Sequence, residues 1–283
     1  MSKIQVIIPV YNAEETIHRC LSSLIGQTFS DWQALIIDDS SSDKSKDIIN
    51  EFADNDNRFV YIKTQKNHGA AGARNEGLLR LCAPYTTFLD SDDVWESDYL
   101  EKMLGYSEKY DADIVQCRYL HDFPNGSVYV PKGVFRKDTV LSGKSLGKIY
   151  KKAATGINMN HVCMKLIKTE LLSGALFDED LRTAEDLDFC IRLYEKTNTY
   201  VFIDSVLYRY NRTGNSLTGS SLSFREKLSA NRTVSHRMAK SIRRMSGKIG
   251  PVAYFYSLLA YIRPYIIIVS KIFRSTRERI IKK

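Results

Sequence analysis

Apolar and polar positions in the first hundred residues follow two alternating periods. Lys3–Val10 is a nearly continuous run of apolar residues, typical of a strand buried on both faces, and apolar residues recur at helical spacing over Ile17–Ile25. Such strand-like and helical patterns keep alternating, which predicts a mainly parallel sheet with helices on both faces. The later strand-like runs are Gln33–Ile37, Arg58–Lys63 and Thr86–Leu89.

Acidic residues gather where the predicted strands end. Ligands of such sheets bind in the crevice beyond the carboxyl ends of the strands, so we expect a shared ligand site there. Helix N-termini also favour Asp, Ser and Asn, which leaves a structural interpretation open at each position. Asn12 followed by Glu15, for example, resembles a helix start. The acidic residues at strand ends are Asp38, Asp39, Asp90, Asp92 and Asp93.

The composition is that of an ordinary folded protein. Its 283 residues are 43% hydrophobic and 26% charged, which excludes a disordered, collagen-like or largely membrane-spanning chain. The length suits one large domain with an appendage, or two domains. The five cysteines form no C-x-x-C pair, which argues against a disulfide framework and a structural zinc site. Because no secretion signal follows Met1, we expect a reducing, cytoplasmic location.

The C-terminal region is both strongly basic and partly apolar. The net charge is +8, yet residues 225–283 carry 15 Lys and Arg against 2 Asp and Glu, so the rest of the chain is acidic. The same region holds an aromatic-rich apolar stretch, Val252–Ile268, which Arg263-Pro264 interrupts, whereas a membrane span needs ~20 uninterrupted apolar residues. We therefore expect an amphipathic helical tail on an anionic membrane surface. The alternative is that the apolar side of this helix packs on the rest of the chain or on a second subunit of a homo-oligomer.

Nucleic acid is not an expected partner. The basic residues of the tail come without glycine-aromatic RNA-binding signatures and without a helix-turn-helix pattern.

The turns after the first and fourth predicted strands indicate which class of nucleotide ligand the protein binds. The first strand-to-helix turn, Pro9-Val10-Tyr11-Asn12, has neither the glycine fingerprint of dinucleotide-binding dehydrogenases nor a P-loop. The fourth strand ends in Asp90-Ser91-Asp92-Asp93. Carboxylates at alternate positions suit Mg²⁺ or Mn²⁺, and these ions usually take substrate phosphates as further ligands. The sequence therefore indicates a metal-bound diphosphate.

Six short blocks occur in order along the chain: Val6–Asn12, Gln27–Phe29, Ile36–Ser40, Asn67–Asn75, Phe88–Asp93 and Ala184–Phe189. Together they resemble glycosyltransferase family 2, the inverting transferases with the GT-A fold, of the bacterial surface-polysaccharide type. The resemblance covers roughly residues 3–215. It implies a GT-A domain at 1–220, with a nucleotide-sugar-binding half at 1–115 and an acceptor-binding half at 116–220. A basic, amphipathic helical region follows at 221–283.

For the donor, the resemblance implies a UDP-sugar. Asp39 would accept a hydrogen bond from the imide N–H of the base, which selects uracil over bases without that donor, and Asp38 would be structural. Arg74, in a glycine-rich segment, would give the nucleotide a fixed positive charge. Arg212 stands where the family often has His, in a loop with Ser216 that would close over the phosphates. The residues implied for nucleotide-sugar binding are Pro9, Val10, Tyr11, Asn12, Asp39, Gly69, Arg74, Asp90, Ser91 and Arg212.

For the chemistry, the resemblance implies a metal site and a base. Asp92 would bind Mn²⁺ or Mg²⁺ directly, Asp90 would bind a ribose hydroxyl or metal-bound water, and Asp93 would cap the next helix. The cation would stabilise the charge that develops on the departing diphosphate. Asp186 would be the general base that takes the proton of the acceptor hydroxyl, and Glu185 would hold the acceptor or orient the base.

The leading hypothesis is an inverting, metal-dependent transfer of a hexose or N-acetylhexosamine from a UDP-sugar to a surface glycan. A lipid-linked acceptor fits the tail, and the enzyme would then sit on the inner face of the cell membrane. A sugar-phosphate nucleotidyltransferase would need a glycine-rich N-terminal phosphate loop that the sequence lacks, and a glycoside hydrolase needs no metal–diphosphate cluster. The non-enzymatic alternative is a protein that only binds a nucleotide sugar or glycan.

Overall fold

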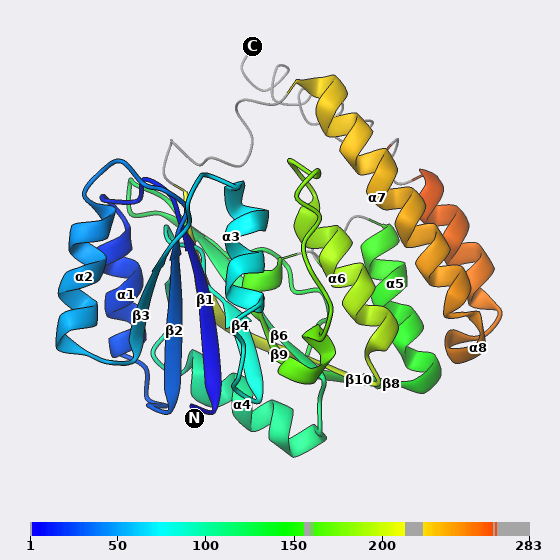
Figure 1. Ribbon diagram of the computed structural model, residues 1–283. Helices are drawn as coiled ribbons and strands as arrows, with labels where there is room; N and C mark the ends of the chain where they lie inside the picture. Colours follow the sequence, from blue (N-terminus) through cyan, green and yellow to red (C-terminus); the bar gives the residue numbers. More distant parts are fainter. Residues whose placement is uncertain (1, 156–158, 160, 213–222, 263, 265–283) are drawn as a thin grey trace, which may run out of the picture.

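The computed structural model describes residues 2–155, 159, 161–212, 223–262 and 264 (Figure 1). These residues form a ten-stranded mixed sheet in the order β3-β2-β1-β4-β9-β6-β10-β5, with β7 paired to β6 and β8 to β10. The strands are β1 Ile4–Val10, β2 Trp32–Asp38, β3 Phe59–Lys63, β4 Tyr85–Phe88, β5 Val94–Trp95, β6 Ile114–Asp122, β7 Val128–Tyr129, β8 Thr139–Ser142, β9 Lys165–Lys168 and β10 Thr199–Asn211. The helices are α1 Ile17–Ile25, α2 Ser45–Asn55, α3 Gly69–Leu78, α4 Tyr99–Tyr110, α5 Gly147–Ala154, α6 Glu185–Lys196, α7 Phe224–Arg244 and α8 Ser246–Ile249.

The first half of the chain folds as its sequence predicts. Strands β1 to β4 lie within one residue of the predicted bounds at each end, and β1 pairs in parallel with β2 and with β4. Ile4, Val6, Ile7 and Ile8 are fully buried, because helices cover both faces of β1. The predicted parallel sheet flanked by helices, as in a GT-A fold, is therefore confirmed for β1 to β4.

Antiparallel pairing enters in the middle of the sheet. β9 lies between β4 and β6 and runs antiparallel to both, whereas β10 runs parallel to β6. β9 comes from the later part of the chain, after the short turn of helix at Val162–Met164. The two halves of the molecule therefore share one sheet.

The helix start predicted at Asn12 is wrong. Helix α1 begins at Ile17, and Asn12 has a left-handed backbone with φ of +47°. The Asn12 side chain accepts a hydrogen bond from the Ser42 N–H at 2.9 Å, and its own N–H donates to Ser41 Oγ at 3.0 Å. Asn12 therefore ties the β1–α1 turn to the β2–α2 loop instead of capping a helix.

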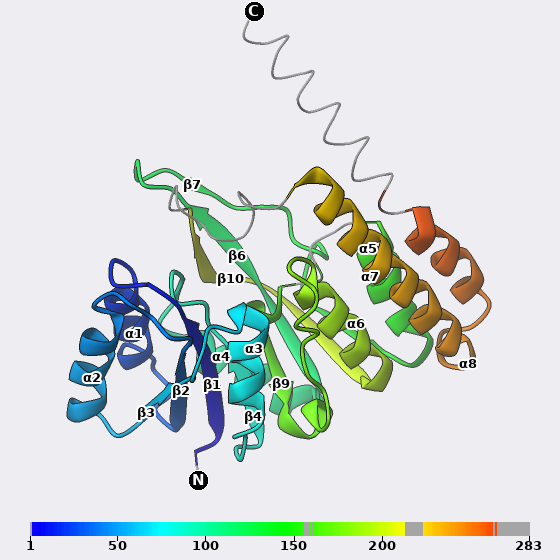
Figure 2. The same ribbon diagram turned by 45° about the horizontal axis from the view of Figure 1, so that its top comes forward.

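The helices α5, α6, α7 and α8 gather at the end of the sheet opposite α1 and α2. In Figures 1 and 2, α7 lies along α6, with α5 beside them. Arg237 of α7 donates to the buried Asp188 of α6 at 3.1 Å, and Arg244 Nε donates to Glu195 at 3.1 Å. A further helical segment covers 252–262. The described part of the chain contains no helix with the length and apolarity that a bilayer span requires, and the predicted tail beyond residue 264 lies outside the described residues.

Candidate active site

Three parallel strands bring distant segments to one edge of the sheet. In the register of β1 with β2, Val10 lies beside Asp38, and in the register of β1 with β4, Ile7 lies beside Phe88. The turns that follow these strands carry Tyr11, Asp39 and Asp90. Because the three strands point the same way, their following turns form a common rim, as the sequence predicts.

Arg74 of α3 is the centre of the acidic cluster. Its side chain is only 6% exposed. Arg74 Nη2 donates to Asp90 Oδ1 at 2.8 Å, and Nη1 lies 3.3 Å from Asp186 Oδ1 and 3.7 Å from Glu185 Oε1. These pairs join the turn after β4 to the first residues of α6. The turn predicted to bind the diphosphate and the residue predicted to be the base therefore contact the same guanidinium group.

The role expected for Arg74 toward the nucleotide stays a prediction, and the structure shows a further set of partners. The sequence-based interpretation gave its charge to the nucleotide, whereas here three carboxylates of the protein surround it. The Arg74 guanidinium also lies over the Phe177 ring, 5.5 Å from its centroid, and Nε is buried without a hydrogen bond within the described residues. Arg74 therefore organises the acidic residues directly.

Glycines shape the turn that leads into α3. Gly69 has φ of +75°, a left-handed conformation that costs glycine little. A Cβ at Gly72 would lie 2.3 Å from the Cβ of His68, so a larger residue could not fit without moving that backbone. The glycines thus let the chain turn tightly before α3 and place Arg74 one turn inside the helix.

Asp39 is buried and already has hydrogen-bond donors. Its Oδ2 accepts from the Gly69 N–H at 2.7 Å, and its Oδ1 accepts from the His68 N–H at 2.9 Å and from Thr64 Oγ1 at 3.0 Å. These bonds satisfy backbone donors at the start of α3. A base N–H could reach this carboxylate only by sharing or replacing one of them, so base recognition by Asp39 stays a prediction.

Asp38 has the structural role that the sequence predicts. It is fully buried, and its two oxygens accept from the Tyr61 hydroxyl at 2.7 Å and the Ser41 N–H at 2.8 Å. Burial and the Asp38 carboxylate together raise the pKa of Tyr61, which keeps this hydroxyl a donor.

The remaining residues predicted for donor binding are divided between the rim and its surroundings. Pro9 and Val10 end β1, Tyr11 is 39% exposed at the rim, and Ser91 follows Asp90 in the same turn. Arg212 is exposed beyond the end of β10: its Nε donates to His121 Nδ1 at 3.1 Å, and its guanidinium lies over Tyr210. Arg212 thus contacts β6 and β10, and its predicted partner Ser216 lies outside the described residues.

Each oxygen of the Asp90 carboxylate has a hydrogen-bond partner. Its Oδ1 bonds Arg74, and its Oδ2 accepts from the Cys163 thiol at 3.1 Å. Burial opposes ionisation here, but the charge and hydrogen bond of Arg74 outweigh it, so the pKa of Asp90 lies below its ordinary value. Sequence reasoning missed Cys163, because a lone buried cysteine carries no motif.

The helix cap predicted for Asp93 is wrong. Asp93 is buried and accepts hydrogen bonds from the Tyr208 hydroxyl and from the Asn211 N–H, both in β10, whereas the next helix begins at Tyr99. Burial, followed by the charges of Asp92 and Asp90, raises the pKa of Asp93 well above its ordinary value. Asp93 therefore links this turn to β10.

Asp92 has the character expected of a residue that binds a cation. Burial and the charge of Asp90 raise its pKa to about 6. A divalent cation would relieve the crowding of negative charge, and carboxylate oxygens are suitable donors for Mn²⁺ or Mg²⁺. Among the described residues no three acidic, His or Cys side chains are arranged to hold a metal ion by themselves. The donor set therefore fits a cation that takes most of its ligands from water and a diphosphate.

Asp186 has the character expected of a base. It lies in the first turn of α6, after Ala184 with its left-handed φ of +65°. Burial raises the pKa of Asp186 to about 7; the Arg74 charge opposes this shift, and the charges of Glu185 and Asp90 add to it. A carboxyl group with a pKa near 7 is about half ionised at pH 7 and largely ionised above it, and its ionised form can accept a proton.

Comparisons with known proteins identify the family of this chain. The profile described as "Glycosyl transferase family 2" matches residues 5–174. The uncharacterised glycosyltransferase EpsJ of Bacillus subtilis is 32% identical over 217 residues, and the match covers 76% of this chain and 62% of EpsJ. The Escherichia coli protein WfgD, named as a UDP-Glc:α-D-GlcNAc-diphosphoundecaprenol β-1,3-glucosyltransferase, is 36% identical over 41% of this chain and 45% of its own length. The chain thus spans less than two thirds of either relative.

A solved structure shows the same fold. The crystal structure of S. aureus TarS residues 1–349 with UDP-GlcNAc superposes with a TM-score of 0.70 at 21% identity, over 93% of this chain and 81% of that one.

Proposed function

Because the chain belongs to glycosyl transferase family 2, we propose that it transfers a sugar from a UDP-sugar to a hydroxyl group of a glycan, with inversion. The observation that carries the proposal is the convergence of Asp90, Glu185 and Asp186 on Arg74, beside Asp92. This cluster joins a diphosphate-binding turn to a carboxyl group that can act as a base. UDP-GlcNAc bound to TarS and the UDP-Glc in the name of WfgD support uridine diphosphate as the leaving group.

In this proposal each residue has a separate task. Asp186 takes the proton of the acceptor hydroxyl as that oxygen attacks the anomeric carbon, and Glu185 orients the acceptor. Arg74 keeps Asp90 and Asp186 in place through its two ion pairs. Tyr11 and Asp39 lie at the rim where the base would bind. A divalent cation at Asp92, when bound, would stabilise the charge on the departing diphosphate.

Metal dependence is a direct test of the site. We expect the enzyme to release UDP from a UDP-sugar in the presence of Mn²⁺ or Mg²⁺ and to lose this activity in EDTA, because the diphosphate would leave without its counter-charge. The measurement is UDP release from UDP-glucose, UDP-galactose and UDP-N-acetylglucosamine, before and after chelation and after re-addition of each metal. Asp92→Asn should raise the metal concentration needed for half-maximal UDP release. Asp54→Asn, on the exposed side of α2, should leave that concentration unchanged. Unchanged turnover in EDTA would contradict the metal role.

We propose that residues 1–115 bind the nucleotide sugar, that residues 116–220 bind the acceptor, and that 221–283 form a separate C-terminal region. The proposed acceptor is a cell-surface glycan. The pyrophosphate-linked lipid in the name of WfgD supports a lipid-linked acceptor, which would place the enzyme on the inner face of the membrane. A protein that only binds nucleotide sugars would not need a carboxyl group with a pKa near 7 at the acceptor side.

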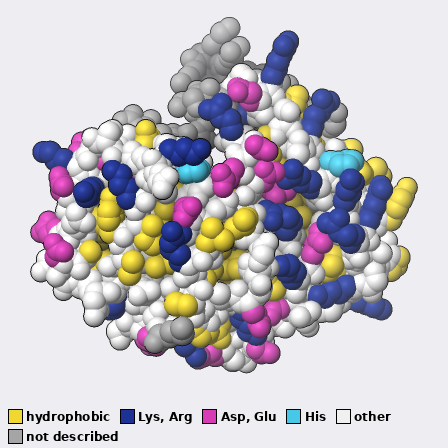
Figure 3. Space-filling view, in the orientation of Figure 1, with side chains coloured by type: hydrophobic (Ala, Val, Ile, Leu, Met, Phe, Trp, Pro, Cys, Tyr) yellow, Lys and Arg dark blue, Asp and Glu magenta, His cyan; other side chains and the backbone are white. Residues whose placement is uncertain are grey.

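The C-terminal helices support attachment to that membrane. Tyr254 is 75% exposed, and Phe255, Leu258 and Ile262 continue the same apolar face of segment 252–262. Lys and Arg side chains gather over the α7 side of the molecule in Figure 3. Exposed apolar side chains beside cations are typical of a helix that lies in the interface of an anionic leaflet.

We expect the protein to sediment with vesicles that contain phosphatidylglycerol and much less with vesicles of phosphatidylcholine alone. Replacing Phe255 and Leu258 together by Ser should reduce this binding, because it removes apolar area from the interface, and added salt should reduce it further. Leu79→Ser is the matched control, since Leu79 is 69% exposed next to α3. Equal binding of the double variant and the wild type would argue against this surface.

A further inference from the structure

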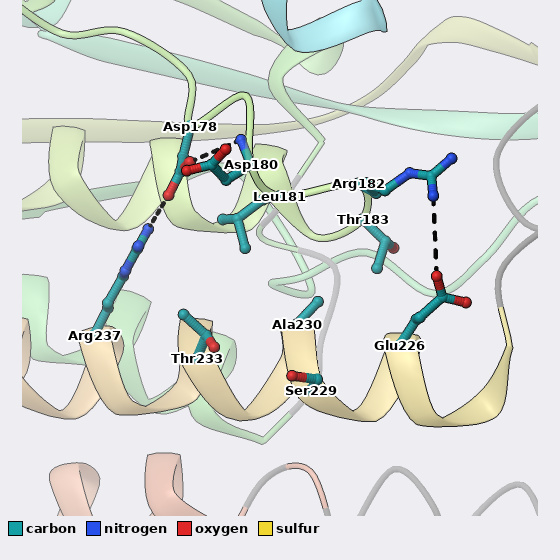
Figure 4. Close-up of a pocket in the computed structure, with 10 residues that line it drawn as sticks. All are labelled: Asp178, Asp180, Leu181, Arg182, Thr183, Glu226, Ser229, Ala230, Thr233 and Arg237. Carbon is teal, nitrogen blue, oxygen red and sulfur yellow. Dashed lines mark hydrogen bonds and ion pairs between the residues drawn. The ribbon is translucent and has the colours of Figure 1, made fainter.

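A pocket of about 360 Å³ lies between the loop 178–183 and helix α7. Figure 4 shows side chains from the two elements facing each other across it. Ser229, Ala230 and Thr233 form the α7 side, at the spacing of one helical face. The pocket is separate from the cluster around Arg74, and its volume is within the range of small-molecule sites.

The two ends of the pocket differ in their ion pairs. At the first end, Arg237 donates to Asp178 at 2.7 Å and to Asp188 at 3.1 Å, and Asp188 is 1% exposed. At the other end, Arg182 and Glu226 lie 3.9 Å apart with side chains 73% and 50% exposed. Such an exposed pair contributes little to stability, so its groups can exchange their partner for a ligand.

The lining suits a neutral ligand with many hydroxyl groups. Carboxylates, guanidinium groups and the hydroxyls of Thr183, Ser229 and Thr233 alternate around the pocket, while Leu181 and Ala230 supply apolar surface. Sugars offer donors and acceptors at adjacent positions together with apolar C–H faces, and this mixture satisfies both signs of charge. The lining carries three carboxylates against two guanidinium groups, a net negative charge that disfavours a phosphate.

The position of the pocket connects it with the candidate base. Thr183 lines the pocket and precedes Asp186 by three residues, so the two Cα atoms are at most roughly 11 Å apart. Within the same loop, Glu179 faces the other way and accepts from Asn75 of α3 at 2.9 Å. The loop 178–183 therefore contacts α3 near the acidic cluster and also lines the pocket.

We propose that this pocket is an acceptor subsite: it binds a neutral sugar unit of the glycan beyond the unit whose hydroxyl is glycosylated. This inference rests on the proposed function, since it assigns the acceptor of the same reaction. The subsite requires an acceptor of more than one sugar unit, and it makes α7 part of the substrate-binding surface.

The test compares the full-length wild type with Ser229→Trp, which fills the pocket from an exposed position of α7. Lys240→Trp, exposed on the same helix outside the pocket, is the matched control, and Asp180→Ala removes one carboxylate without adding bulk. Saturation-transfer NMR with methyl β-glucoside, methyl N-acetyl-β-glucosaminide, lactose and cellobiose reports binding. UDP release from UDP-sugars, with and without each saccharide, reports transfer and hydrolysis.

We expect saturation transfer to at least one saccharide in the wild type and in Lys240→Trp, its loss in Ser229→Trp and its reduction in Asp180→Ala. Hydrolysis of the donor by water should be equal in all four proteins, because the donor does not enter the pocket. Saccharide binding that persists in Ser229→Trp, or is absent from the wild type, overturns the subsite whether or not UDP is released. Loss of saccharide binding in Ser229→Trp without UDP release from any protein supports a carbohydrate pocket and counts against the proposed transfer.

Discussion

Replacing Asp186 by Asn is expected to lower the turnover number by roughly 100- to 10,000-fold, the usual contribution of a general base. The acceptor hydroxyl would keep its proton as its oxygen attacks, since an amide cannot accept that proton. Nucleotide affinity should stay unchanged, because Asp186 lies at the start of α6 and not at the ends of β1 and β2. The measurements are the rate of UDP release and the binding of UDP by calorimetry.

The pH dependence gives this prediction a second readout. A base works only when it is deprotonated, and the pKa of Asp186 is raised to about 7. The rate of the wild type should therefore fall as the pH decreases through about 7, and the residual rate of Asp186→Asn should lack this step. The variant should also fold well, because it places a neutral amide where burial disfavours charge. Turnover close to that of the wild type would exclude Asp186 as the base.

Replacing Arg74 by Met is expected to reduce the free energy of unfolding by about 3–5 kcal/mol, the range found when one partner of a buried ion pair is removed. The loss has a clear cause: Asp90, Glu185 and Asp186 would remain close together without the guanidinium group that all three face. Methionine fills much of the volume, so the effect reports mainly the charge. Urea unfolding followed by circular dichroism measures it as a shift in the midpoint.

Arg80 is the matched control for this experiment. It lies two residues beyond α3 and forms an exposed pair with Glu76, so Arg80→Met should change the stability by no more than ~1 kcal/mol. Combining Arg74→Met with Asp186→Asn should recover part of the loss, since one of the uncompensated charges disappears. A stability of Arg74→Met equal to that of Arg80→Met would show that the carboxylates do not depend on Arg74.

The sequence predicts local structure well because the signals are local. The strands β1 to β4 are recognisable from short apolar runs, and the acidic residues follow them directly. The contacts of the cluster are different: Arg74 and Asp186 are 112 residues apart along the chain, and no spacing rule predicts their ion pair. Asn12 shows the same limit on a smaller scale, since its partner Ser42 belongs to another loop.

The resemblance to a family located the candidate base and the acidic turn, but it could not assign the hydrogen-bond partners. Asp39 was expected to face a base, and its oxygens accept from the backbone at the start of α3. Asp93 was expected to cap a helix, and it binds β10. In both cases the residue type was informative, whereas its partner depended on which segments the sheet brings together.

The insertion of β9 between β4 and β6 has a consequence for how the chain can reach its native state. Until residues 165–168 are available, β4 presents an unpaired row of N–H and C=O groups, the kind of edge that recruits strands of other molecules. A fragment ending near residue 115 would keep that exposed edge permanently, so self-association is its expected fate. During synthesis the edge of β4 therefore stays uncovered until a much later segment has been made, which favours aggregation of the incomplete chain.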